Sequence, residues 1–477
     1  MKVTYKILLA ALLVAIGCSS CDNFLSIRPK DALYPKTLTD YENLLNFPEL
    51  MKTGATFPSF MTDDIYILDE PEPYAAAPYL LSIEAHKRTL YTFGHGDVFS
   101  DAEPDYFWTS TYKNIDYYNT VIEYAPDATE ATDEEKTRVI AEAKAARALE
   151  YLCLINCYAP QYDPKTATAD QSGVPLVLHP DIMQGDLKRA TLQECYDQVL
   201  TDLTDALPHL PEIAKPSKYR MSRGGCAGIL ARAYLILGDY KKCLSYANEA
   251  MKSNDHLLDL RTITVIDPYG YIGRSSMPLA IDDPEAILIR LAPYAYGNCE
   301  DQVSASPELV SHFDEEHDRR SAIYYIDNYY GMPFEPSTLR LYSAWYQENI
   351  GISSSEMYLT AAECEARIGS ADRAMELLNK LRTNRIEGYE PITAAGMDRE
   401  KVLDEVLLER RREFALRGMF RFIDLRRFAK DPKRAVTVTH NTGDGQTESI
   451  TADDPRFTLP IPQVVMRINP NMKQNKR

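Results

Sequence analysis

The chain has 477 residues, a formal net charge of −18, and hydrophobic and charged fractions of 45% and 26%. Domains usually contain about 100–200 residues, so this length exceeds one simple core. The composition is that of a globular protein, which excludes wholesale disorder and a multi-span membrane protein. The acidic charge argues against a nucleic-acid partner, because phosphates attract lysine and arginine.

Residues 1–20 have the features of a cleaved export signal. Lys2 and Lys6 precede an apolar run over residues 7–16, which is shorter than the about 20 residues that span a bilayer. Small residues then lead to Cys18 and Cys21, as in a bacterial lipoprotein processing site, and either cysteine is a candidate for lipidation. An ordinary secretory signal with incidental cysteines is the alternative.

A lipid anchor would hold such a chain stably. Each buried CH₂ group contributes about 0.8 kcal/mol, and bacterial lipoproteins carry two or three acyl chains. Cleavage after residue 20 removes two lysines and no acid, which leaves a net charge of −20. An anionic bilayer repels this charge, so the lipid rather than a basic patch is expected to bind the membrane.

Two segments are predicted to form long helices. Over 107–124, residues between Ile115 and Ile122 recur at the i, i+3, i+4, i+7 spacing of one helix face. The second segment, 134–158, is rich in alanine and ends just before Pro160, because proline cannot continue a helix.

Two helical hairpins are predicted further along. The segment 224–252 breaks at Gly238, and small residues follow Ala231 at offsets of 7, 12, 16 and 19. From Ala362 the same four offsets reach Gly369, Ala374, Leu378 and Leu381. This is the spacing of a tetratricopeptide (TPR) hairpin. The two units start 131 residues apart, so they are not a tandem array, and two unrelated hairpins are the alternative.

Long proline-containing regions at 58–104 and 261–349 lack helical periodicity, and such loops are usually functional. A β-hairpin is predicted between 436–439 and 448–451. The fold class is therefore mainly α, with TPR-like helical hairpins as a scaffold, long loop-rich insertions and minor β-hairpins.

No catalytic residue, metal site or cofactor is predicted. The chain lacks HExxH, GxSxG and a phosphate-binding loop. The pairs Asp63-Asp64 and Asp282-Asp283 are interpreted as solvated loop acids. The run 409–413, with Glu413 and Arg417 as an i, i+4 helical pair, is interpreted as a structural ion-pair network. Seven further cysteines are interpreted as small core residues: Cys153, Cys157, Cys195, Cys226, Cys243, Cys299 and Cys364.

Aromatic residues in the two loop regions are the best functional signal. Of 32 tyrosines, ten lie in 261–349, where Trp345 joins them. Aromatic planes stack on the C–H faces of sugars, and tyrosine adds a hydroxyl for hydrogen bonds. The predicted ligand-binding residues are Tyr74, Tyr79, Tyr269, Tyr271, Tyr294, Tyr296 and Trp345. The alternative is that these rings pin the loops to the helices.

Seven motifs in order resemble the SusD/RagB family of bacterial surface lipoproteins over the length from Cys21 to the C-terminus. They are Cys21-Asp22-Asn23-Phe24-Leu25 with Pro29-Lys30-Asp31; Trp108, Tyr112, Ile115 and Asn119; 142–148 leading to Tyr158-Ala159-Pro160; Ala231-Arg232-Ala233-Tyr234 with Gly238-Asp239-Tyr240; Met357-Tyr358-Leu359 with Ala361-Ala362-Glu363; 409–413 through Phe422-Ile423-Asp424-Leu425; and Leu459-Pro460-Ile461-Pro462 with Asn469-Pro470-Asn471 and Gln474-Asn475.

The resemblance implies an outer-membrane lipoprotein that faces the cell exterior and is not an enzyme. It implies capture of glycans or other nutrients for a SusC-like TonB-dependent transporter, and it favours Cys21 as the lipidated residue over Cys18. Sugar binders of the family often use tryptophan in their aromatic platform, whereas Trp345 alone is left for one in this chain.

The domains expected are a signal peptide (1–20), an N-terminal helical region (21–260), a ligand-binding loop-rich insertion (261–352) and a C-terminal SusD/RagB region (353–477). A TPR-type protein-binding adaptor without its own small ligand is the alternative function, and a surface glycoside hydrolase is a third one.

Overall fold

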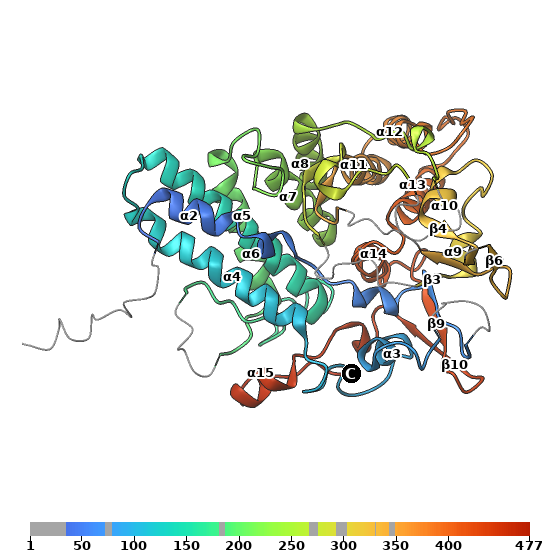
Figure 1. The fold of residues 1–477 in the computed structure, drawn as a ribbon, viewed down its shortest axis with the longest axis horizontal. Coiled ribbons are helices and arrows are strands. Elements are labelled where there is room, and N and C mark those ends of the chain that lie inside the picture. Colours follow the sequence, from blue (N-terminus) through green and yellow to red (C-terminus); the bar gives the residue numbers. More distant parts are fainter. Residues whose placement is uncertain are drawn as a thin grey trace, which may run out of the picture.

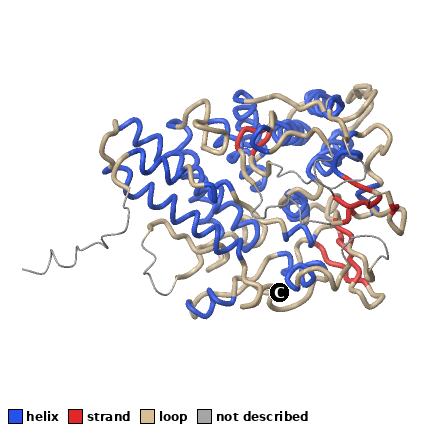
Figure 2. The backbone as a smooth tube through the Cα atoms, viewed as in Figure 1, coloured by secondary structure: helices blue, strands red, loops and turns tan. Residues whose placement is uncertain are grey.

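The computed structural model describes residues 35–71, 79–180, 187–266, 275–291, 303–329, 331–342 and 349–477. Helices are the main secondary structure of the described chain, and most of the strands lie at the right of Figure 2. The longer helices are α2 (Leu38–Leu45), α4 (Tyr106–Tyr124), α5 (Asp133–Tyr158), α6 (Leu192–Ala206), α7 (Arg223–Leu237), α8 (Tyr240–Ser253), α11 (Ser354–Ile368), α12 (Ala371–Thr383), α13 (Arg399–Phe414) and α14 (Phe420–Phe428). The short ones are α3 (Ala85–Tyr91), α9 (Pro307–Val310), α10 (Arg319–Tyr324) and α15 (Gln463–Ile468).

Both predicted long helices are confirmed as α4 and α5, and their ends follow from local chemistry. The Asp105 side chain accepts a hydrogen bond from the Trp108 amide at 3.0 Å, which caps α4. Thr132 and Glu135 form a capping box at the start of α5. The helix α6 was not predicted, although its buried residues from Leu192 to Ala206 have helical spacing.

The two predicted helical hairpins are confirmed as α7–α8 and α11–α12. Gly238 adopts a left-handed conformation with φ of 78°, which ends α7 and allows the chain to turn into α8. In the first hairpin α8 packs on α11 of the second, although a long insertion separates them in sequence (Figure 1). Fully buried small residues allow this close approach: Ala231, Ala247, Ala250, Ala362 and Ala374.

Within the described residues, ten short strands form one four-stranded and three two-stranded antiparallel sheets. The four-stranded sheet has the order β1–β3–β7–β4, and the pairs are β2–β8, β5–β6 and β9–β10. The pair β9–β10 confirms the predicted C-terminal hairpin. The bounds are β1 (Ile65–Tyr66), β2 (Ala286–Leu288), β3 (Ser304–Ala305), β4 (Tyr325–Ile326), β5 (Asn328–Tyr329), β6 (Met332–Pro333), β7 (Arg340–Tyr342), β8 (Ile352–Ser353), β9 (Thr437–Asn441) and β10 (Thr447–Thr451).

The six described cysteines of the predicted seven are buried, which confirms them as small core residues, and Cys299 lies outside the described residues. Among the helices that the structure describes, none is long and apolar enough to cross a bilayer. One large hydrophobic core runs through the helices and one face of the four-stranded sheet.

Candidate functional site

The four-stranded sheet joins the two loop regions that carry the predicted aromatic surface. Strand β1 comes from the first region, and β3, β7 and β4 come from the second. In the sheet register Tyr66 lies opposite Ser304, Ser304 opposite Leu341, and Leu341 opposite Ile326. Segments about 240 residues apart in sequence are thus fixed side by side by backbone hydrogen bonds.

Three chain segments leave this sheet at one end. Because neighbouring strands are antiparallel, the end of β1, the start of β3 and the end of β7 fall together. The Tyr342 amide donates to the Val303 carbonyl at 2.9 Å at this end. From here the chain continues toward 72–78, 292–302 and 343–348, which lie outside the described residues.

Most predicted ligand-binding residues belong to segments that the structure does not describe. They are Tyr74, Tyr269, Tyr271, Tyr294, Tyr296 and Trp345, and the candidate lipidation sites Cys18 and Cys21 also lie outside the described residues. Their roles stay predictions. Tyr79 is described: it forms a β-bridge with Leu68, so the two ends of the segment 72–78 are held together.

Tyr79 and Tyr66 pack on a small hydrophobic cluster on the second face of the sheet. The buried members of this satellite cluster are Leu68, Ile326, Phe334, Leu339 and Leu341. Tyr66 and Tyr79 are only partly buried there. Such amphipathic rings suit the border between a packed cluster and a wet surface.

Other loop tyrosines pin the loops. Tyr324, Tyr325 and Tyr342 are all buried, and the Tyr325 and Tyr342 rings meet edge to face at 5.6 Å. Tyr91 is also buried, and its hydroxyl donates to Asn441 Oδ1 at 2.5 Å. For these rings the alternative interpretation, in which tyrosines hold the loops to the scaffold, is the correct one.

The interpretation of Asp63 and Asp64 as solvated loop acids is wrong. Arg421 donates two hydrogen bonds to Asp63, at 2.8 and 2.6 Å, and Arg411 donates to Asp64 at 2.7 Å. The Asp64 side chain is fully buried. These ion pairs fix the residues that lead into β1 against α13 and α14, and local sequence gives no signal for such distant partners. Of the second pair, Asp282 is exposed and Asp283 is half-buried.

Burial and arginine act oppositely on the two carboxyls. Burial opposes the charge of Asp63, but Arg421 and Arg411 outweigh it and hold its pKa at about 2. For Asp64 burial dominates over the same arginines, and the neighbouring Asp63 charge adds to it, so the pKa is raised. One oxygen of Asp64, Oδ2, has no hydrogen-bond partner among the described residues.

His440 and Asn441, which the sequence marked only as a hairpin turn, fasten the same segment from the other side. The His440 ring stacks between Tyr91 at 4.1 Å and Phe93 at 4.9 Å. Its two nitrogens face the carbonyl oxygens of Tyr91 and Thr62, at 2.7 and 2.9 Å. The Asn441 amide donates to the Ile67 carbonyl at 2.9 Å, and the hairpin β9–β10 thereby holds the strand β1.

The predicted structural ion-pair network on α13 is confirmed. Glu409 accepts hydrogen bonds from Arg320 of α10 at 2.6 Å and from Arg382 of α12 at 2.7 Å. Burial opposes the Glu409 charge, yet these guanidiniums lower its pKa. The expected pairing of Glu413 with Arg417 on one helix is wrong, because α13 ends at Phe414 and Arg417 lies in the following turn. Although burial opposes the Glu413 charge, the Arg417 charge still acts on Glu413 and helps to lower the pKa of its carboxyl.

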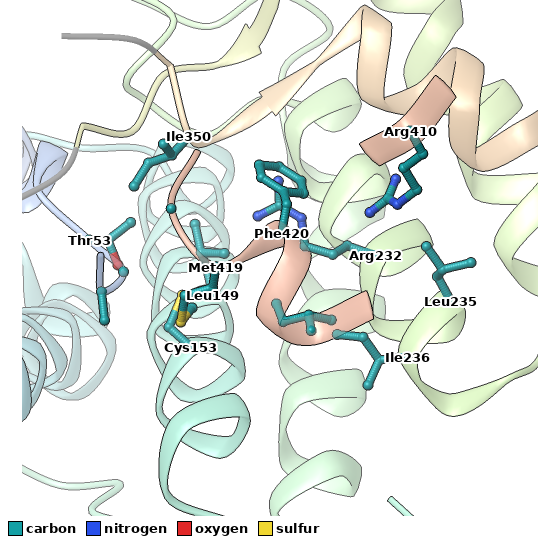
Figure 3. Close-up of a pocket in the computed structure, with 14 residues that line it drawn as sticks. Thr53, Leu149, Cys153, Arg232, Leu235, Ile236, Ile350, Arg410, Met419 and Phe420 are labelled. Carbon is teal, nitrogen blue, oxygen red and sulfur yellow. The ribbon is translucent and has the colours of Figure 1, made fainter. Parts of the chain in front are cut away.

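A pocket between α5, α7 and α14 is too small for a sugar (Figure 3). Its volume is about 50 Å³, whereas small-molecule sites usually have about 300–1,000 Å³. Arg232 and Arg410 both lie over the Phe420 ring that lines it, at 5.2 and 5.7 Å from the centroid. Its lining is mostly apolar and includes buried core residues such as Leu149 and Cys153. The described residues contain no cluster of three or more metal-binding side chains.

Two family models match the chain. One is described as "Starch-binding associating with outer membrane" and covers residues 76–235, and the other is described as "SusD family" and covers residues 352–477. Together they span more than half of the sequence. The chain belongs to the SusD/RagB family. A comparison with curated proteins gives no match.

Solved structures of the SusD superfamily have the same fold. A protein from Bacteroides thetaiotaomicron is 22% identical with a TM-score of 0.67, and 92% of this chain and 100% of that chain are covered. A putative sugar-binding protein from Bacteroides vulgatus is 20% identical with a TM-score of 0.69, covering 93% and 99%. A laminarin-binding SusD-like protein is 19% identical with a TM-score of 0.62, covering 92% and 99%. The SusD-like fold class is thus confirmed.

We expect the Arg421→Ala variant to be strongly destabilised at pH 7. The substitution removes the guanidinium that donates two hydrogen bonds to Asp63, next to the buried Asp64. The Arg421 and Asp63 side chains are 11% and 14% exposed, and breaking a buried ion pair costs about 3–5 kcal/mol. The lowered Asp63 pKa stabilises the fold above its unfolded value of 3.8, and this contribution is lost as pH falls toward 2. The difference between wild type and variant should therefore shrink from pH 5 to pH 2 in chemical denaturation.

Arg373→Ala is the matched control, because Arg373 pairs with Glu376 on the exposed surface of α12. It should leave the free energy of unfolding nearly unchanged at all pH values. Equal effects of the two variants would mean that the Asp63 pair does not hold the fold.

Proposed function

We propose that this chain is a lipoprotein of the outer membrane that faces the cell exterior, binds glycans or other nutrients and delivers them to a SusC-like TonB-dependent transporter. The observation that carries the proposal is the shared end of β1, β3 and β7. The described ends of three segments meet there, and those segments contain Tyr74, Tyr294, Tyr296 and Trp345. Family membership supports the proposal.

A glycan ligand fits the chemistry of this surface. Aromatic rings can cover the C–H faces of a sugar, and tyrosine hydroxyls can pair with sugar hydroxyls. We assign this role to the insertion 261–352, together with the segment around Tyr74 and Tyr79. Relatives of the same fold described as sugar-binding and laminarin-binding support a carbohydrate ligand.

The surroundings of Asp63 and Asp64 favour binding of the ligand without catalysis. A glycoside hydrolase needs two carboxyls that face a scissile bond at a defined separation. Asp63 and Asp64, just before β1, instead form ion pairs with Arg421 and Arg411, so their carboxylates are engaged in the scaffold. This favours a binding protein over the hydrolase alternative, and we propose that binding needs no cofactor.

We expect Trp345→Ala, and likewise Tyr74→Ala, to weaken oligosaccharide binding at least tenfold with an unchanged Tm. A ring that stacks on the ligand contributes to binding and not to the core, so its loss should lower the affinity and leave Tm unchanged. Isothermal titration of the mature chain with maltoheptaose and laminarihexaose measures the Kd, and product analysis should find no cleavage. Tyr106→Ala is the control, because this ring is 63% exposed at the start of α4, outside both predicted ligand-binding segments.

A matching fall in Tm would mean that the rings are structural. An adaptor for proteins only would bind none of the sugars in saturable fashion, and release of shorter sugars would favour the hydrolase.

The lipid anchor is tested by Cys21→Ala. We expect the variant to leave the membrane fraction and to lose incorporation of radiolabelled palmitate, since an anionic bilayer repels the net negative charge of the chain. Cys18→Ala is the matched control and should remain anchored. Retention of lipid in Cys21→Ala, with loss in Cys18→Ala, would identify Cys18 as the lipidated residue.

The transporter partner is tested by purification of the tagged wild type from detergent-solubilised outer membranes. We expect recovery of a TonB-dependent β-barrel protein in comparable molar amount, identified by mass spectrometry. An unrelated lipoprotein that carries the same tag and is purified from the same membranes is the control. Recovery of no β-barrel protein would contradict the proposed delivery step.

A further inference from the structure

A second pocket lies against the face of the four-stranded sheet that is opposite the satellite cluster. Side chains alternate along a strand, and Tyr325 is paired with Tyr342, so Tyr325, Asp327 and Arg340 point to the same face. The helices α9 and α10 and the turn between them cover this face at the right of Figure 1. The lining residues are Val310, Phe313, Glu315, Ser321, Ala322, Tyr325, Asp327 and Arg340.

The floor of this pocket is apolar and held in place. The Phe313 and Tyr325 rings lie 5.6 Å apart with an interplanar angle of 58°. The guanidinium of Arg320 lies 5.8 Å from the centre of Phe313, and Arg320 is itself locked by Asp318, Glu409 and Glu413. A ring fixed in this way loses little conformational entropy when a ligand stacks on it.

The rim of the pocket is polar and accessible. Arg340 donates to both oxygens of Glu315, at 3.2 Å each, from a side chain that is 18% exposed. Asp327 is exposed and accepts a hydrogen bond from the Asn328 side chain at 2.8 Å, and Ser321 is partly exposed. A planar guanidinium and a carboxylate can each bridge two neighbouring hydroxyls, and a serine hydroxyl can donate or accept.

The volume fits one sugar ring. It is about 170 Å³, more than three times the volume of the pocket beside Phe420. Sites for larger ligands have about 300–1,000 Å³, so a longer oligosaccharide would have to extend beyond the pocket.

We propose that this pocket is a second carbohydrate subsite, which holds a single neutral pyranose ring. Its ligand class rests on the proposed glycan-binding function, but its residues differ from those of the surface at the shared strand end. Arg340 and Asp327 lie at the opposite end of their strands from Tyr342 and Tyr325. Two subsites on one rigid sheet would raise the affinity for a branched or polymeric glycan through effective concentration.

Titration calorimetry of the mature chain with D-glucose, D-mannose, D-galactose and L-fucose tests the proposal. We expect at least one of them to bind with a millimolar Kd, and Arg340→Ala and Asp327→Asn to weaken that binding at least fivefold. Asp327→Asn keeps the size of an exposed side chain, so it tests the subsite even if Arg340→Ala is unstable. Arg373→Ala removes an equally charged, exposed residue of α12 and should bind like wild type.

Hydrogen–deuterium exchange localises the sugar, and we expect slower exchange over residues 307–327 in its presence. Laminarihexaose and maltoheptaose are titrated in parallel. If they bind while no monosaccharide slows exchange over 307–327 and both variants bind like wild type, the subsite is refuted and the proposed function stands. If no sugar of either kind binds the wild type, the subsite is refuted and so is a glycan as the ligand of the proposed function.

Discussion

Five consecutive side chains of α13 connect the loops of this protein to its helices. A helix turns by about 100° per residue, so residues 409–413 point in all directions from its axis. Glu409 reaches α10 and α12, Arg410 reaches Asp424 of α14, and Arg411 reaches Asp64 before β1. Four of the five charges are buried, that of Arg412 is partly exposed, and all five are paired, so removal of one partner leaves another without compensation. The position of the sheet relative to the scaffold follows from this helix.

The two helical hairpins meet across a long insertion because small residues and a strand pair bring them together. Alanines on α8 and α11 are fully buried and let the helices approach closely. The strand β2, in the first part of the insertion, pairs with β8 at its end, just before α11 begins. This pairing brings the two ends of the insertion close together. A stack of helices therefore continues as though the residues between the hairpins were absent.

The helices α4, α5, α7 and α8 were predictable because their apolar spacing and end signals are local. The four-stranded sheet was not, since strands of two or three residues show no periodicity and their partners lie far away in sequence. The burial of Asp64 was missed for the same reason, because only the fold reveals Arg411 beside it. The aromatic candidates were chosen from composition, and the described fold places the strands that lead to several of them at one end of one sheet.

The register of that sheet has an evolutionary consequence. The ends of 72–78, 292–302 and 343–348 are set by hydrogen bonds and ion pairs of other residues, such as Leu68 with Tyr79 and Tyr342 with Val303. Insertions or substitutions inside the three segments leave these bonds intact. One scaffold could therefore exchange these three segments, to which we assign ligand binding, between homologues at little cost in folding stability.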